Sequence, residues 1–128
     1  MKPAKDLVLI LTRELATNLA TPMFVADAEG NLVFYNEPAE RILGRPFAEA
    51  GEVVASEWES LFSVESIDGQ PMSLEQMPSG IAFLERRAAH GALRITGLDG
   101  TKHELSVTAF PLFKRGQEFL GMVAIFWE

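Results

Sequence analysis

Residues 25–36 read VADAEGNLVFYN, and residues 37–44 continue with EPAERILG. Two short runs rich in aromatic and branched residues, Met23–Ala26 and Leu32–Tyr35, flank a segment of turn-forming residues. Within that segment Gly30 can adopt a positive φ without steric cost, and Asp27 and Asn31 can hydrogen-bond to nearby backbone groups. A gap of this length that contains a glycine is typical of a β-hairpin. The two runs are therefore predicted to pair as antiparallel strands.

The residues after this hairpin predict a short helix. Asn36 suits the N-cap position, and Glu37 and Glu40 lie in the first turn, where the helix dipole favours acidic side chains. Leu43 closes the apolar turn, and Gly44 follows as a left-handed terminator. The stretch as a whole predicts a hairpin followed at once by a helix that Asn36 caps.

The last third of the chain is predicted to be three strands. The runs 92–98, 103–113 and 118–127 are separated by Asp99-Gly100 and by Arg115-Gly116, which are hairpin signals. In the middle run Leu105, Val107 and Ala109 fall on one face, because side chains alternate along a strand. A three-stranded antiparallel meander follows from this pattern.

The other segments are predicted to be helices and loops. Residues 5–19 carry apolar residues at helical spacing, which predicts an amphipathic helix. In residues 37–88 we expect short helices, with a capping box at residues 56–59. Pro78 suits the first turn of one of these helices, although Ser73 and Gln76 also have capping-box spacing, so that helix can begin a turn earlier. Five strands and a helical crossing make an α+β domain, with one antiparallel sheet covered by helices on one face.

Composition excludes several classes of protein. A length of 128 residues fits one domain, and the absence of cysteine removes disulfides, thiolate nucleophiles and cysteine metal sites. The apolar run at residues 7–11 is too short for a membrane span or a signal peptide, so we expect a cytoplasmic protein without a membrane partner. A net charge of −7 argues against a nucleic-acid partner. Residues 46–85 contain eight acids and no Lys or Arg. This acidic segment is interpreted as a solvated surface, as a cation site or as a surface for a basic partner.

The sequence resembles the PAS domains, a family of small sensor and interaction modules. The resemblance covers about residues 20–127 and is carried by TPMFVADAEGNLVFYNEPAERILG, HGALRITGLDGTKHELSVTAFPLF and GQEFLGMVAIF. It implies a five-stranded antiparallel sheet of order 2-1-5-4-3, with helices arching over one face to enclose a pocket. The chain then divides into an N-terminal amphipathic helix, residues 1–20, and a PAS domain, residues 21–128.

The cysteine and histidine content of the chain restricts which cofactors such a pocket can hold. Members of the family that form a flavin–cysteine adduct or attach coumarate need a cysteine, which this chain lacks. Haem-binding members use a helical histidine upstream of the meander, whereas His90 and His103 lie at strand starts, where surface roles are expected. We therefore expect no cofactor and no metal site.

A pocket in this fold would be lined by one face of the meander. The face that carries Leu105 corresponds to the ligand-facing side of the sheet in the PAS family. We expect a small, mostly apolar ligand there. Tyr35 and Phe24 either contact this ligand or fill the core. The predicted ligand-binding residues are Phe24, Tyr35, Leu93, Ile95, Leu105, Val107, Ala109, Val123 and Ile125.

No motif indicates catalysis. The chain has no nucleophile elbow, phosphate-binding loop or zinc-protease signature. A small α+β enzyme with Asp27 or Glu104 as general base is an alternative, but hairpin-turn and exposed-strand roles explain both residues. We predict no enzyme activity and no catalytic residues.

The N-terminal helix is predicted to form a homodimer. Its apolar stripe can dock on its own domain, and Leu9 and Ile10 widen the stripe into a patch of the kind that marks contacts. The competing interpretation is contact with a neighbouring domain. The predicted dimer interface comprises Leu7, Val8, Leu9, Ile10, Leu11 and Leu15.

The sequence thus predicts a regulatory PAS sensor and interaction domain in signal transduction. It would bind a small apolar ligand, a signalling protein, or both, and its own second copy. The alternative is a ligand-free PAS domain that serves as a dimerisation or docking module of a larger signalling protein.

Overall fold

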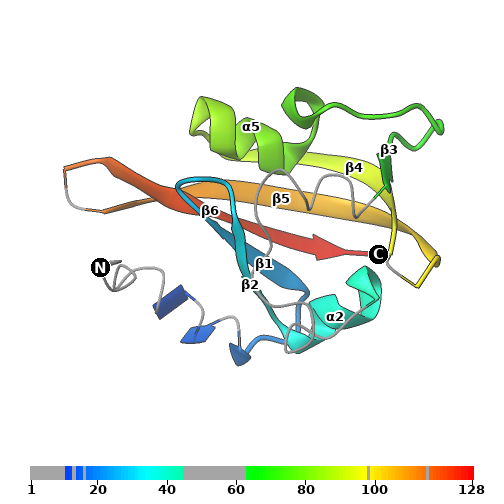
Figure 1. Ribbon diagram of the computed structural model, residues 1–128, viewed down its shortest axis with the longest axis horizontal. Coiled ribbons are helices and arrows are strands. Elements are labelled where there is room, and N and C mark those ends of the chain that lie inside the picture. Colours follow the sequence, from blue (N-terminus) through cyan, green and yellow to red (C-terminus); the bar gives the residue numbers. More distant parts are fainter. Residues whose placement is uncertain (1–10, 13, 16, 45–62, 98, 115) are drawn as a thin grey trace.

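The computed structural model describes residues 11–12, 14–15, 17–44, 63–97, 99–114 and 116–128. In that part of the chain the fold consists of a curled antiparallel sheet and a few short helices (Figure 1). None of the helices described is long and apolar enough to cross a membrane. The elements in chain order are β1 (Met23–Asp27), β2 (Leu32–Tyr35), α2 (Glu37–Leu43), β3 (Ser63–Glu65), the 3-10 turn η1 (Leu74–Gln76), α5 (Pro78–Glu85), β4 (Ala89–Thr96), β5 (Lys102–Lys114) and β6 (Glu118–Trp127).

The sheet order is β2-β1-β6-β5-β4-β3. Its first five positions reproduce the predicted order, with β6 at the centre beside β1. The sixth strand, β3, was not predicted, because three residues are too short to show a strand pattern. It pairs with β4 through Val64 opposite Ile95 and extends the edge of the sheet.

The first hairpin and its helix are confirmed. The carboxylate of Asp27 accepts hydrogen bonds from the N–H groups of Glu29 and Asn31, both at 3.0 Å, and Gly30 has φ of +85°. Asn36 caps α2, and its side chain accepts from the Ala39 N–H at 3.2 Å. The predicted turn chemistry and N-cap therefore form this corner of the fold.

The segment before β4 settles the question of where its helix begins. The side chain of Gln76 accepts from the Ser73 N–H at 2.9 Å, but this contact belongs to η1. The α-helix α5 starts separately at Pro78 and ends at Glu85, and its C-cap Arg86 has φ of +58°. β4 then begins at Ala89, three residues earlier than predicted. The predicted capping box at residues 56–59 lies outside the described residues.

The two faces of the sheet carry different hydrophobic clusters. The inner face packs under α2 and α5 and includes Leu105, Val107 and Ala109. The outer face carries a smaller cluster of Met23, Val25, Val33 and Val123, against which Leu19 packs. In Figure 1 the described residues before β1, drawn in blue, lie on the side of the sheet opposite α5. The sheet is therefore a shared wall between two apolar layers.

The hairpin of β5 and β6 contains an irregularity that changes which side chains face the core. The register shifts between Leu112 and Phe113, and beyond the shift Val107 pairs with Phe126 and Ala109 pairs with Ala124. Paired residues of antiparallel strands share a face. The prediction that Val123 and Ile125 face the core beside Leu105 is therefore wrong: both belong to the outer cluster.

Gly121 lies next to this irregularity and permits the close approach of β1. Its φ is +149°, and a side chain there would collide with the carbonyl oxygen of Ala26. β1 and β6 pair through this point, with Asp27 opposite Gly121. Only glycine satisfies both the backbone angle and the space.

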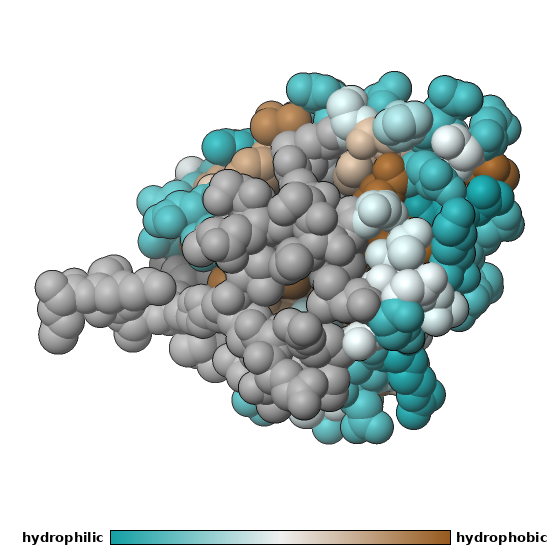
Figure 2. All heavy atoms as spheres, turned by 45° about the vertical axis from the view of Figure 1, so that its right-hand side comes forward, coloured by the Kyte–Doolittle hydropathy of each residue, from teal (hydrophilic) through white to brown (hydrophobic). Residues whose placement is uncertain are grey.

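The N-terminal helix is helical at the residues described between 11 and 17. Leu11 and Leu15 are 57% and 58% exposed. The predicted interface residues Leu7, Val8, Leu9 and Ile10 lie outside the described part of the chain. On the face that Figure 2 shows, the described residues are mostly hydrophilic, with separate hydrophobic spots. Among the described residues, the other large hydrophobic side chains that are exposed are Ile67, Leu84, Phe113 and Trp127.

Candidate functional site

An apolar cavity lies between the inner face of the sheet and the helices. Its volume is about 50 Å³, whereas roughly 10–15 Å³ suffices for one water molecule. Five strands, α2 and the start of α5 contribute to its wall. The lining residues are Phe24, Leu43, Val64, Met77, Ser79, Leu93, Ile95, Leu105, Val107 and Phe126.

Five of the nine predicted ligand-binding residues line this cavity: Phe24, Leu93, Ile95, Leu105 and Val107. Tyr35 and Ala109 lie in the same buried core but not in the cavity wall. Val123 and Ile125 lie on the opposite face of the sheet. The alternation of side chains along a strand thus predicted cavity-facing residues on β4 and β5, but it predicted the wrong face for the two residues of β6.

The remaining wall residues were missed by the sequence reasoning. Phe126 could have been found from the true register of β5 and β6, because it pairs with Val107. Its ring packs against Phe24, with the centroids 6.0 Å apart. Leu43 ends α2 and Val64 lies on the unpredicted β3, so neither carried a pattern that points to the cavity.

The start of α5 brings a polar side chain into this wall. Ser79 is 9% exposed, and it is the one hydroxyl among the lining residues described. Met77 is the N-cap residue of α5 and provides no side-chain hydrogen bond, and Pro78 follows it. The start of this helix therefore meets a space whose other described wall residues are apolar.

The sequence position of His103 suggested a surface residue, but most of its side chain is buried. Its side chain is 13% exposed, and its Nδ1 lies 3.2 Å from a carboxylate oxygen of Glu128. Its Nε2 is buried without a hydrogen-bond partner among the residues described. Pairing with Ile95 puts His103 on the inner face, near one end of the cavity wall. His90, in contrast, is exposed on β4, with its Nδ1 2.8 Å from the Thr108 hydroxyl.

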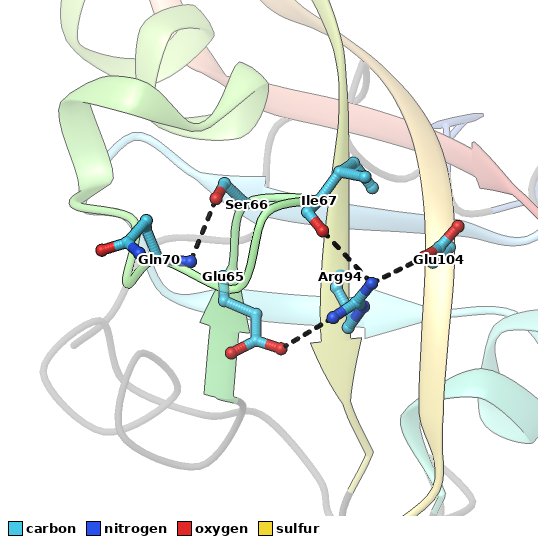
Figure 3. Close-up of polar contacts among 6 residues, drawn as sticks. All are labelled: Glu65, Ser66, Ile67, Gln70, Arg94 and Glu104. Atoms are coloured by element: carbon cyan, nitrogen blue, oxygen red, sulfur yellow. Dashed lines mark hydrogen bonds and ion pairs between the residues drawn. The ribbon is translucent and has the colours of Figure 1, made fainter.

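The outer face of β3, β4 and β5 is polar. Arg94 donates to Glu104 at 2.7 Å, to Glu65 at 3.5 Å and to the carbonyl of Ile67 at 3.2 Å (Figure 3). The hydrogen bond to Glu104, together with the charges of Glu104 and Glu65, raises the pKa of Arg94 above its ordinary value. The guanidinium thereby ties the loop after β3 to the sheet.

The same contacts give structural roles to the two acids considered as general bases. Glu104 pairs with Arg94 on the exposed outer face, away from the cavity. Asp27 holds the first hairpin turn through Glu29 and Asn31. Within the described residues, no group of three or more His, Asp or Glu side chains is placed to hold a metal ion.

Comparison with known folds gives a consistent result. The PAS domain of the fruit-fly ELK potassium channel matches with a TM-score of 0.74 at 8% identity, over 96% of this chain and 98% of that one. The PAS domain of a protein from Colwellia psychrerythraea gives 0.66 at 15% identity, over 94% and 96%. The PAS domain of nitrogen regulation protein NR(II) from Vibrio parahaemolyticus gives 0.60 at 17% identity, over 92% and 97%. At such identities the likeness shows the fold.

A search among curated proteins found no significant match. A family profile, in contrast, recognises the sequence. The profile that describes the PAS domain matches residues 20–127, which include every strand of the sheet together with α2 and α5. The chain belongs to the PAS domain family.

Proposed function

We propose that this chain is a regulatory sensor and interaction module that binds a small, mostly apolar ligand in the cavity and performs no catalysis. The observation that carries the proposal is the cavity itself, whose described wall residues are apolar except for Ser79. We place the module in the cytoplasm, with a signalling protein as its downstream partner.

A cavity of this kind is unusual in a protein core. Interiors pack as densely as organic crystals and contain few voids larger than a water molecule. Ligand pockets are mostly apolar, with few polar groups that fix orientation. The cavity volume of about 50 Å³ limits the ligand to a few non-hydrogen atoms in the arrangement described.

The strand β6 is the proposed route from the cavity to the output surface. Phe126 faces the cavity, whereas Val123 and Ile125 of the same strand lie in the outer cluster against which Leu19 packs. A ligand that moves Phe126 would shift this outer layer and the N-terminal helix. Such a ligand must bind the two arrangements with different affinities, because only that difference can shift their populations.

Xenon is a suitable probe because apolar cavities bind it without any specific chemistry. Under xenon pressure the methyl resonances of Leu93, Ile95 and Val107 should shift in a saturable manner, while those of Val123 on the outer face should not. A Val107→Phe variant should fill the cavity and abolish the shifts. Equal effects on Val107 and Val123, or no saturable shift, would overturn the proposal.

A second proposed function is homodimerisation through the N-terminal helix. Its supporting observation is that Leu11 and Leu15 are exposed although they belong to the apolar stripe. Burial of two leucines contributes roughly 3–6 kcal/mol before association costs, so a stable dimer must also bury other apolar surface. We propose that the rest of the predicted interface, Leu7 to Ile10, supplies it.

A further inference from the structure

Three phenylalanines and an arginine gather where the end of α5 meets the hairpin of β5 and β6. The ring of Phe119 lies at the centre, with its centroid 5.6 Å from that of Phe83 and 6.1 Å from that of Phe113, both in edge-on arrangements. The guanidinium carbon of Arg86 lies 4.3 Å from the centroid of the Phe119 ring, which is a cation–π contact. We call these four residues the arm cluster, because the hairpin extends past the end of α5 like an arm (Figure 1).

The arm cluster is open to solvent on one side. Phe119 is only 7% exposed, but Phe113 is 42% exposed and Arg86 is exposed as well. An exposed ring that contacts a second ring and lies beside a cation differs from a hydrophobic residue that stands alone on a surface. Aromatic residues and arginine are also the side chains enriched at protein–protein interfaces. The composition of the arm cluster therefore favours a protein partner.

The backbone beside the arm cluster is strained. Arg86, with φ of +58°, and Gln117, with φ of +63°, are the non-glycine residues with positive φ in the part of the chain described. Helices commonly end in glycine at such a position, because a side chain there costs free energy. Strain of this kind is concentrated at functional sites. Because the end of α5 alone would favour glycine, the arginine needs another explanation, and its guanidinium over Phe119 points to one.

The charges next to the arm cluster define the kind of partner. The whole chain carries −7, but three bases, Arg86, Arg87 and Lys114, stand here against the two acids Glu85 and Glu118. Arg87 pairs with Glu85 at 2.9 Å and Lys114 with Glu118 at 2.7 Å, which leaves Arg86 without a carboxylate among the described residues. A carboxylate of a partner can pair with this guanidinium at little desolvation cost, because Arg86 is exposed.

We propose that the arm cluster docks an acidic segment of the signalling partner, in which an aromatic or aliphatic side chain packs on Phe113 and a neighbouring carboxylate pairs with Arg86. The inference rests on the proposed interaction function, for which it names the surface and the chemistry of the partner. It does not depend on the cavity, so a ligand-free docking module would use the same surface.

The test uses capped synthetic peptides in chemical-shift titrations of the whole chain. The acidic probe carries a phenylalanine between two pairs of glutamates. The basic probe has lysines in place of the glutamates, and the glycine probe has glycine in place of the phenylalanine. At millimolar concentrations, the range of weak binding, the acidic probe should shift the resonances of Arg86, Phe113 and Phe119 in a saturable manner. The other two probes should bind severalfold more weakly.

Two variants with matched controls test the residues. Arg86→Gln should weaken the acidic probe about two- to fivefold, the effect of one exposed ion pair. Arg41→Gln, which removes an exposed charge on α2, should leave its affinity unchanged. Phe113→Ala should also weaken the acidic probe. Trp127→Ala should not, although Trp127 has the same exposed fraction of 42% at the other end of β6.

Arg86→Gly separates binding from folding. Glycine fits the positive φ better than arginine does, so this variant should melt at the wild-type temperature or above it. It should nevertheless bind the acidic probe as weakly as Arg86→Gln does. A lower melting temperature would show that the guanidinium is needed for the fold itself, and this would overturn the inference.

Three further results would also overturn it. Equal binding of the acidic and basic probes, or equal losses in the variants and their controls, would show that the arm cluster does not select an acidic segment. A short oligothymidylate that binds more tightly than the acidic probe, and that Arg86→Gln weakens, would assign the surface to nucleic acid. None of these results bears on xenon binding in the cavity, so the proposed ligand-binding function is decided separately by that experiment.

Discussion

At the scale of single residues, Asn36 joins three parts of the fold. It is 1% exposed, and its side-chain oxygen accepts from the N–H groups of Met23 and Ala39 at 3.0 and 3.2 Å. Its amide nitrogen donates to the carbonyl of Thr21 at 2.9 Å. One side chain therefore caps α2 and also fixes the chain that enters β1. The sequence predicted the cap but not the second task.

Asn36→Ala is expected to destabilise the domain by about 2–4 kcal/mol, because a helix cap is lost and buried backbone groups are left unpaired. Urea unfolding followed by circular dichroism measures this change. Asn18→Ala provides the control, because its side chain also bonds to backbone but is exposed. Equal losses in the two variants would contradict the role assigned to Asn36.

At the scale of secondary-structure elements, most of the fold could be predicted from local signals. Turn residues and alternation identified the three hairpins and the strands β1, β2, β4, β5 and β6. The sequence could not predict which side chains of β6 point to the inner face. Six consecutive residues of this central strand, Phe119 to Ala124, are buried, so the strand shows no alternation.

The register of the β5–β6 hairpin explains the specific error on the cavity wall. Continuing the pairs Lys114–Glu118 and Phe113–Phe119 without interruption would put Val107 opposite Ile125. The bulge moves the pairing by one residue, so Phe126 takes that place. A one-residue shift turns every later side chain to the other face, and nothing in the local sequence specifies such a shift.

Two positions of β5 on the inner face should respond oppositely to added volume. Val107 lines the cavity, so Val107→Ile should leave stability unchanged or raise it by up to about 1 kcal/mol. Ala109 is fully buried outside the cavity wall, so Ala109→Val should cost about 1–3 kcal/mol by overpacking. Thermal melts of the pair test this. Equal destabilisation would indicate that the wall at Val107 has no free space.

The edge strand β3 should depend on Arg94 more than the domain as a whole does. Arg94→Met removes the contacts to Glu65 and Ile67. Because these groups are partly exposed, global stability should fall by less than about 1 kcal/mol. Amide hydrogen exchange in residues 63–70 should nevertheless accelerate, relative to β1.

Arg41→Met is the control for this variant, because Arg41 forms an exposed pair with Glu37 at 3.9 Å. It should leave exchange in residues 63–70 unchanged. Unchanged exchange in the Arg94 variant would show that backbone pairing alone holds β3.

At the scale of the whole molecule, the prediction concerns self-association. The wild type should sediment as a dimer at tens of micromolar, and a Leu11→Glu, Leu15→Lys double variant as a monomer, because charges on the stripe oppose its burial. Leu84→Glu is the control, since Leu84 is 50% exposed on α5, on the other side of the sheet. A wild type that stays monomeric at this concentration would refute the dimer.

The close approach of Gly121 to Ala26 has a consequence for how this sequence can vary. In a library that randomises one position at a time and selects for folded protein, position 121 should return glycine alone, because any side chain would separate β6 from β1. Gly100 and Gly116 also have positive φ but face open space, so asparagine should survive at both. Sequencing the selected pool would read this out, and an enriched alanine at 121 would mean that the centre of the sheet is more adaptable than its packing indicates.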